Sequence, residues 1–330
     1  MGKTNLEILF EWLDQTTEMI QQHEDEPYLD SLVITMETLF YQSPSNNVDD
    51  LLSHKLQKKL NELQVNEFSA EELRKAIQLA ILKGMQRTTQ PNHLMTPEAV
   101  ALFIGYLAKK LTKDQPELSV FDPVCGTANL LTIVLSQLKN PSQSYGSEID
   151  TTLIRLALYN ANLQKKNIEF FHQDSLRPFL LDPVDIVVAD LPVGYYPDDD
   201  HAKSFELKAE QGHSYAHHLL IEQSMNYTKK GGYLLFLVPE FIFESDQSKQ
   251  LHKYLHEHAH IVGVMRLPES AFTSNKNIKS ILILQKKGEE TSTPKQPLLV
   301  DLPSFNNALA MEDILEKINA WFHEYHNLNN

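Results

Sequence analysis

The amino-acid sequence predicts an α/β fold, a mostly parallel sheet that follows an N-terminal helical domain. Three observations favour this fold class. Apolar residues recur at helical spacing up to about residue 88, β-rich runs alternate with helical segments from about residue 95, and the last two long β-rich runs are joined by a link without a helix-length pattern. Alternation indicates parallel strands with helices on both faces, whereas a short link favours an antiparallel pair.

The first domain, residues 1–88, is expected to contain only helices. Helical periodicity runs from Leu6 to Ile20, over Tyr28–Tyr41 and over Leu51–Leu63. A fourth helix should run to Lys83, because Ser69 and Glu72 form a capping box at its start. Two roles stay open for this domain. It is a scaffold or dimerisation module, or it contributes to substrate binding.

The second domain, residues 89–330, is expected to hold a seven-stranded sheet with an antiparallel final hairpin. A further strand over Leu298–Leu302 and a helix over Met311–Tyr325 should close the chain. The seven main β-rich runs are Ser119–Val124, Gln143–Ile149, Ile168–Gln173, Val184–Leu191, Tyr233–Val238, Ile261–Leu267 and Lys279–Gln285.

Composition narrows the class of protein. The 330 residues carry a net charge of −15, which weighs against broad non-specific binding of nucleic acid but not against a local basic cleft. One cysteine, Cys125, excludes a disulfide framework within the chain and suits a reducing compartment. The start lacks a signal-peptide pattern, and no apolar run is long enough to span a bilayer. We therefore expect a cytoplasmic protein.

Four successive predicted strands end next to a carboxylate. These acids are Asp122, Glu148, Asp174 and Asp190. The first strand also runs into a turn with Gly126, which allows close approach of a ligand to the backbone. Each acid alone is typical of a helix N-cap, but four in order at the carboxyl ends of parallel strands predict a nucleoside cofactor site.

Three segments carry a family resemblance that covers roughly residues 85–305. Asp122–Ala128 matches the pattern D-P-x-x-G-T-G, His93–Pro97 resembles F-x-T-P, and Asp190–Gly194 stands in the place of N-P-P-F-G. The chain thus resembles the adenine-specific (N6) DNA methyltransferases, especially the modification subunits of type I restriction systems. It is most similar to a Firmicutes group with the variant D-L-P-V-G-Y-Y-P. The resemblance implies a Rossmann-like fold that depends on S-adenosylmethionine (SAM).

The same resemblance implies where SAM binds. Glu148 would hold the ribose, Ile149 would pack on the adenine ring, and Asp174 would accept from the adenine amine. Asp122 and Gly126 would contact the amino-acid moiety. The implied cofactor residues are Thr96, Pro97, Asp122, Cys125, Gly126, Thr127, Glu148, Ile149, Asp174 and Ser175. No metal site is expected.

The turn after the fourth strand carries the predicted chemistry. The Asp190 carboxylate and the Leu191 carbonyl would accept hydrogen bonds from an exocyclic amine and favour a pyramidal, more nucleophilic nitrogen. A carboxylate also suits the positive charge that develops there. Val193 stands where the family has an aromatic, so a neighbouring tyrosine would stack on the base. The candidate catalytic residues are Asp190, Leu191, Pro192, Tyr195 and Tyr196.

These residues favour an N-methyltransferase that acts on adenine in DNA. RNA or protein is an alternative acceptor, and a non-catalytic SAM-binding protein is a third possibility, since Leu191 replaces a proline. Ala128 replaces a glycine, a change that is tolerable only if its φ is negative. Since no target-recognition domain of obvious size follows residue 305, either sequence specificity comes from a partner subunit or from the N-terminal helices, or the protein has none.

Other features have plainer interpretations. The pairs His213/His217 and His252/His256 have metal-ligand spacing, but no acid or cysteine pattern completes a site, so solvated helix faces are expected. The loop Gly194–Gly212 is expected to gate the substrate. Candidate phosphate contacts, none in a basic run, are Arg87, Arg266, Lys276 and Lys279.

Overall fold

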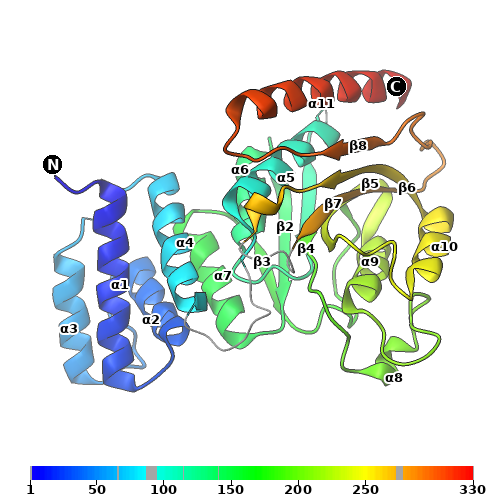
Figure 1. Ribbon diagram of the computed structural model, residues 1–330. Helices are drawn as coiled ribbons and strands as arrows, with labels where there is room; N and C mark the ends of the chain where they lie inside the picture. Colours follow the sequence, from blue (N-terminus) through cyan, green and yellow to red (C-terminus); the bar gives the residue numbers. More distant parts are fainter. Residues whose placement is uncertain are drawn as a thin grey trace.

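The computed structural model describes residues 2–64, 67–86, 95–113, 115–139, 141–272 and 278–329. A lobe of helices lies beside a sheet that carries helices on both faces (Figure 1). The predicted fold class, a Rossmann-like α/β domain behind a helical N-terminal region, is confirmed. The sheet has eight strands instead of seven, because β8 (Leu298–Asp301) pairs with β6 in parallel.

The N-terminal lobe is formed by the amphipathic helices that the periodicity predicts. Their apolar faces bury a shared core that includes Leu13, Leu32 and Ile77. The capping box forms, with the Ser69 N–H donating to Glu72 Oε2 at 2.8 Å and the Glu72 N–H donating to Ser69 Oγ at 3.2 Å. The four helices are α1 (Asn5–Glu24), α2 (Tyr28–Tyr41), α3 (Asp50–Asn61) and α4 (Ala70–Gln86).

The sheet has the strand order β3-β2-β1-β4-β5-β7-β6-β8. Strand β7 is antiparallel to both of its neighbours, and the other ladders are parallel. The order reverses between β1 and β4, which is where open α/β sheets bind ligands. The other strands are β1 (Leu118–Asp122), β2 (Pro141–Glu148), β3 (Glu169–His172), β4 (Val184–Asp190), β5 (Thr228–Pro239), β6 (Ala259–Arg266) and β7 (Lys279–Lys286).

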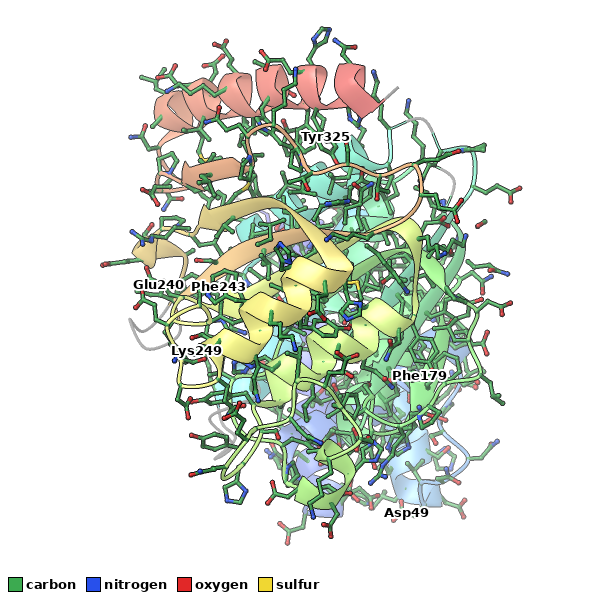
Figure 2. All side chains as sticks on the ribbon, turned by 90° about the vertical axis from the view of Figure 1, so that its right-hand side faces the viewer. Asp49, Phe179, Glu240, Phe243, Lys249 and Tyr325 are labelled. Atoms are coloured by element: carbon green, nitrogen blue, oxygen red, sulfur yellow. The ribbon has the colours of Figure 1, made fainter. Side chains whose placement is uncertain are left out.

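Helices cover the sheet in two layers. Apolar residues of α5 (Glu98–Leu111), α6 (Asn129–Gln137) and α11 (Ala308–Asn329) share one core with the sheet, and those of α9 (Ala216–Asn226) and α10 (Ser248–His258) share another. Figure 2 shows Tyr325 on the sheet side of α11, and its hydroxyl lies 3.2 Å from that of Tyr233.

Helix α7 (Thr151–Leu163) joins the two parts of the molecule. Its buried side chains Leu153, Leu156 and Tyr159 belong to the core of the N-terminal lobe, while Ala157 belongs to the core of the sheet domain. The Thr152 hydroxyl donates to Asp30 Oδ1 of α2 at 2.5 Å. The helical lobe is therefore packed onto the helix that follows β2.

None of the described helices combines the length and the apolarity that crossing a lipid bilayer requires.

The turn between β1 and α6 corrects one expectation. Ala128 has φ +59° and ψ +24°, so this residue keeps the left-handed conformation that a glycine would favour. The condition of a negative φ is therefore not met, and the alanine stands in the left-handed geometry of the tight turn from β1 into α6. Ala128 is fully buried.

We expect Ala128→Gly to change the free energy of unfolding by less than about 1 kcal/mol. Relief of left-handed strain, about 1–2 kcal/mol, is offset by loss of a buried methyl group, about 0.8 kcal/mol, and by added chain entropy. Ala128→Val should cost at least about 2 kcal/mol, because a β-branched residue disfavours this conformation. Urea unfolding measures both, and a valine variant as stable as the wild type would contradict the strained turn.

Candidate active site

Three of the predicted acids meet at the carboxyl edge of the sheet. Asp122 ends β1, Glu148 ends β2 and Asp190 ends β4, and parallel neighbours bring these ends together. The Asp122 side chain is 1% exposed, and one of its oxygens accepts from the Val124 N–H at 3.1 Å. Burial, followed by the negative charges of Asp190 and Glu148, raises the pKa of Asp122 well above its ordinary value. This edge favours a cationic ligand.

The turn after β1 leaves room for a ligand against its backbone. Gly126 has φ +55°, and a Cβ built on it would meet nothing within 4 Å. Its N–H donates to Glu148 Oε2 at 3.1 Å. Cys125 is buried, and its N–H donates to the Ser147 carbonyl at 2.8 Å, while the carbonyl of buried Thr127 accepts from Asn160 Nδ2 at 2.9 Å. The backbone anchors the turn while one side of Gly126 stays open.

The segment after β2 offers an acid next to an exposed apolar side chain. Glu148 Oε1 accepts from the N–H groups of Ile149 at 2.8 Å and Asp150 at 2.9 Å. Ile149 is 65% exposed although it is fully apolar. Asp150 caps α7 by accepting from the N–H groups of Thr152 and Leu153. Ile149 thus faces outward at this edge, whereas the Glu148 carboxylate is held by backbone N–H groups and Asp150 has a structural role.

S-adenosylmethionine fits these residues. It carries a positive sulfonium and an α-ammonium, and the acids at this edge repel one another unless a cation lies between them. The free space at Gly126 admits a ligand against the backbone, and Ile149 offers an apolar surface for a flat ring.

The acid after β3 has partners within the protein. Asp174 accepts from the Leu176 N–H at 3.0 Å and from the Tyr196 hydroxyl at 2.5 Å. Burial and this carboxylate raise the pKa of Tyr196. The buried Ser175 hydroxyl donates to the Pro123 carbonyl and lies 2.9 Å from Ser147 Oγ. The side chain of Ser175 therefore ties the turns after β1 and β3 to the end of β2. The cofactor roles of Asp174 and Ser175 stay predictions.

The turn after β4 presents two oxygens to one ammonium group. Lys279 Nζ donates to Asp190 Oδ1 and, at 2.9 Å, to the Leu191 carbonyl. The other Asp190 oxygen accepts from the Thr96 hydroxyl at 2.8 Å. The Thr96 carbonyl in turn accepts from Asn129 Nδ2 at 3.2 Å. Thr96 directly precedes Pro97, the N-cap residue of α5. Both acceptors that the sequence assigns to a substrate amine are thus engaged by a lysine.

The sequence placed Lys279 only among candidate phosphate contacts, and the structure shows it bound inside the acceptor turn instead. The sequence feature that could have located Lys279 at this turn is its position at the start of a predicted strand. Because β7 runs antiparallel, its first residue lies opposite Pro239, at the edge where the parallel strands end. Arg266 pairs with Glu240 at 2.9 Å, and Arg87, His93, Leu94 and Lys276 lie outside the described residues.

The two tyrosines after the turn lie in different surroundings. Tyr195 is 57% exposed and stacks on Tyr215 with ring centroids 4.9 Å apart. Tyr196 is buried and faces Asp174. Pro192 and Val193 are both exposed beside them. Tyr195 is therefore the more exposed of the two rings, although it already stacks on Tyr215.

The loop that begins at Gly194 is fastened at both ends. Its bonds include the Tyr196 N–H to the Ser214 carbonyl at 2.8 Å and the Arg177–Asp198 ion pair at 2.5 Å. The predicted irregular stretch also contains one short helix, α8 (Asp199–Ala202).

Burial of His217 corrects the expectation of solvated helix faces for the paired histidines, and its neighbour His218 and, in β6, His260 are buried as well. His217 and His218 are fully buried in α9, whereas His213, His252 and His256 are exposed as expected. Burial, then the neighbouring His218 and Lys279, lowers the pKa of His217 to about 3, with the Pro192 carbonyl opposing the shift. Burial lowers the pKa of His218 to about 4. Both rings are therefore neutral near pH 7.

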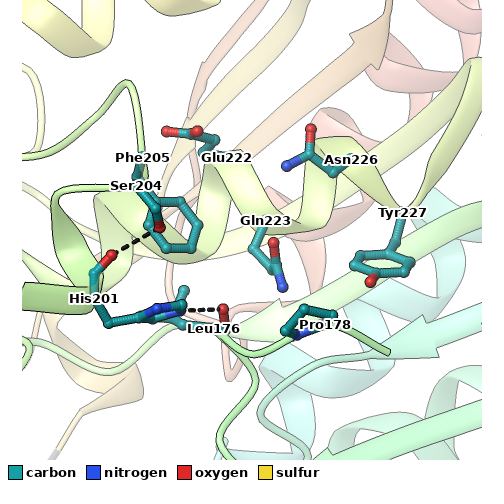
Figure 3. Close-up of a pocket in the computed structure, with 9 residues that line it drawn as sticks. All are labelled: Leu176, Pro178, His201, Ser204, Phe205, Glu222, Gln223, Asn226 and Tyr227. Carbon is teal, nitrogen blue, oxygen red and sulfur yellow. Dashed lines mark hydrogen bonds between the residues drawn. The ribbon is translucent and has the colours of Figure 1, made fainter. Parts of the chain in front are cut away.

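A cavity of 420 Å³ lies apart from these residues (Figure 3). Its polar side chains are largely satisfied within the protein, since His201 bonds to the Leu176 carbonyl at 2.8 Å and Ser204 Oγ donates to the His201 carbonyl at 2.7 Å. Glu222 accepts from two backbone N–H groups. None of the strand-end acids lines this cavity.

Comparison with known proteins identifies the family of the chain. Residues 84–330 match the family model described as N-6 DNA Methylase, and residues 7–85 match the YtxK N-terminal helical domain. The two matches meet near the predicted domain boundary at residue 88, which itself stays a prediction.

Three relatives illustrate the range of similarity. Uncharacterized protein YtxK of Bacillus subtilis (strain 168) is 45% identical over 98% of this chain and 99% of its own length. A Listeria monocytogenes structure described as a class I S-adenosylmethionine-dependent methyltransferase has 41% identity and a TM-score of 0.90, covering 96% of this chain and 98% of that one. The Escherichia coli type I restriction enzyme EcoEI methylase subunit is 24% identical over 71% of this chain and 50% of the subunit. The chain therefore belongs to the N-6 DNA methylase family of S-adenosylmethionine-dependent methyltransferases.

Proposed function

We propose that this protein is an N-methyltransferase that transfers the methyl group of SAM to the exocyclic amine of adenine in DNA. The supporting observation is that the Asp190 carboxylate and the Leu191 carbonyl both accept from a single nitrogen, Lys279 Nζ. Two acceptors that converge on one ammonium have the arrangement needed to accept both N–H bonds of an amine. The resemblance to the EcoEI methylase subunit supports DNA as the substrate.

The chain's own residues would activate the amine. An adenine amine is a poor nucleophile because its lone pair is delocalised into the ring. Acceptors on both N–H bonds favour a pyramidal nitrogen, and the Asp190 carboxylate stabilises the positive charge that forms on it. Thr96 holds the second Asp190 oxygen, so the carboxylate keeps its orientation. SAM supplies a methyl group on a sulfonium, which is already electrophilic.

The cofactor would lie along the carboxyl edges of β1 and β2. Asp122 would hold the amino-acid moiety of SAM, because the α-ammonium of SAM would relieve the repulsion of Asp122 by Asp190 and Glu148. The proposed residues around this moiety are Thr96, Pro97, Cys125, Gly126 and Thr127. Glu148 would accept from the ribose hydroxyls, and exposed Ile149 would cover the adenine ring. Asp174 would accept from the adenine amine once Tyr196 releases it.

We expect Glu148→Ala to weaken SAM binding at least about tenfold, because the ribose contact is lost. Calorimetric titration of SAM measures the change. Glu169→Ala, which removes an exposed acid from the neighbouring strand β3, is the matched control and should bind normally. Since Glu148 also accepts backbone N–H groups, a thermal unfolding scan checks that the variant is folded. Unchanged affinity in a folded variant would contradict the placement of the ribose.

Recognition of a base within duplex DNA would require the base to leave the stack. Base flipping into a pocket is the usual solution, and an aromatic side chain then stacks on the base. Tyr195 supplies an exposed ring next to the acceptor turn, where Val193 cannot stack. With a net charge of −15, the chain is poorly suited to hold DNA alone, so we propose a separate specificity partner.

A second function is favoured by specific departures from the family pattern. Leu191 and Val193 replace a proline and an aromatic residue, and Lys279 fills the amine position. A protein that binds SAM without transferring its methyl group would tolerate all three.

Incubation with radiolabelled SAM distinguishes these functions. The acceptors are unmethylated DNA, total RNA and a cell lysate, each tested with wild-type protein and with Asp190→Ala. Label in DNA that disappears in the variant supports the proposal. Label found only in RNA or protein would mean that RNA or protein, and not DNA, is the methyl acceptor. SAM binding without any methyl transfer would support the non-catalytic function.

A further inference from the structure

Lys279 is bound in the manner expected of a substrate amine. Its ammonium donates to Asp190 Oδ1 and to the Leu191 carbonyl, the two oxygens proposed to hold adenine. The Lys279 and Asp190 side chains are 16% and 19% exposed, so the pair is largely withdrawn from water. Lys279 Nζ and a substrate nitrogen would occupy the same position between these two oxygens, so only one of them can bind there at a time.

We propose that Lys279 is an internal occupant of the acceptor-amine site, which the substrate amine has to displace and which the charge of SAM loosens. This inference rests on the proposed function for the identity of the site. On this proposal Lys279 controls entry of the substrate amine, while Asp190 and the Leu191 carbonyl bind that amine.

The charges at the carboxyl edge explain why a lysine lies there. Asp122 experiences the negative charges of Asp190 and Glu148, so a cofactor-free edge is stabilised by a cation. Lys279 supplies that cation, and Thr96 contributes only a neutral hydroxyl on the opposite Asp190 oxygen. Neutral His217 adds no charge that would hold or repel the ammonium near pH 7.

The same charges couple Lys279 to the cofactor. Once the sulfonium occupies this acidic edge, it competes with Lys279 for the same negative charge, and the two cations repel each other. Binding of SAM should therefore weaken the interaction of the Lys279 ammonium with Asp190 and the Leu191 carbonyl. S-adenosylhomocysteine (SAH) carries the same α-ammonium but has a neutral sulfur, so it should affect Lys279 less.

The first experiment measures binding and needs no methyl acceptor. SAM and SAH are titrated calorimetrically into wild-type protein, Lys279→Met and the charge-conserving Lys279→Arg. We expect Lys279→Met to tighten SAM binding at least about threefold more than SAH binding, with Lys279→Arg close to wild type. The difference should shrink at high salt. An unchanged ratio of SAM to SAH affinity in Lys279→Met would overturn the coupling.

The second experiment measures methyl transfer to unmethylated DNA. Lys279→Met should raise kcat/KM about tenfold or more, because the amine site no longer has an internal competitor. Lys279→Gln, which keeps donor groups but no charge, should fall between the methionine variant and the wild type. A lower kcat/KM in both neutral variants, with normal thermal unfolding, would show that Lys279 assists the reaction and would overturn the proposal.

The two experiments separate the inference from the proposed function. If no variant methylates DNA but the SAM to SAH ratio shifts, DNA is the wrong acceptor and Lys279 still occupies an amine site coupled to the cofactor. If the wild type methylates DNA while neither the ratio nor the rate responds to Lys279→Met, the function stands and the inference about Lys279 is wrong.

Discussion

Asp190→Ala should reduce the rate of methyl transfer at least about 10³-fold while SAM affinity stays within about threefold of wild type. The variant removes the carboxylate that orients the amine and stabilises its developing charge, and loss of one such group typically costs about 10²–10³-fold. An added loss follows because Lys279 and Thr96 lose their shared partner and the acceptor turn loosens. Single-turnover transfer from radiolabelled SAM, combined with calorimetry, measures both quantities.

Asp190→Asn is the informative control for this prediction. Asparagine keeps an oxygen acceptor of the same shape and stands at this position in the N-P-P-F pattern that the turn resembles. It also weakens the ion pair with Lys279. We therefore expect Asp190→Asn to retain much more activity than Asp190→Ala. Equal activity of the alanine variant and the wild type would place the chemistry elsewhere.

Asp122→Asn should weaken SAM binding at least about tenfold near pH 7 and make the cofactor-free protein more stable. The carboxylate is buried beside two other acids, and these surroundings raise its pKa. Ionised Asp122 is unfavourable in the cofactor-free protein and favourable next to a bound cation. The amide removes both effects, so stability and cofactor affinity should change in opposite directions, as thermal unfolding and calorimetry would show.

The pH dependence of Asp122 provides a second measurement. Because its pKa is raised in the folded, cofactor-free protein, folding takes up a proton at a pH between the unfolded and the folded pKa. The stabilisation from this proton is present below the unfolded pKa and is lost as the pH rises through the folded value. Conversely, SAM affinity should fall as the pH drops through that raised pKa, since proton and cofactor compete. In Asp122→Asn this part of the pH dependence should disappear, and a curve like that of the wild type would assign it to another group.

The sequence by itself determined the elements and the positions of the acids along the chain. Strand and helix periodicity is local, so the runs that end at Asp122, Glu148 and Asp190 could be assigned without knowing their neighbours. Parallel connection then brings those ends to one edge, because every right-handed crossover returns the chain in the same direction. The N-terminal helices and the capping box at Ser69 were predictable for the same reason.

Only the tertiary structure decided what surrounds those acids. Lys279 is 89 residues from Asp190 and reaches it because β7 pairs with β5 as well as with β6. The short link predicted the antiparallel β6–β7 pair, whereas no local pattern encodes the long-range pairing of β7 with β5. The burial of His217 and His218 follows from packing of α9 on the sheet, and their spacing alone predicted solvated faces. Local periodicity specifies which side of an element is apolar, whereas the partner of each polar side chain depends on contacts that form when the whole chain has folded.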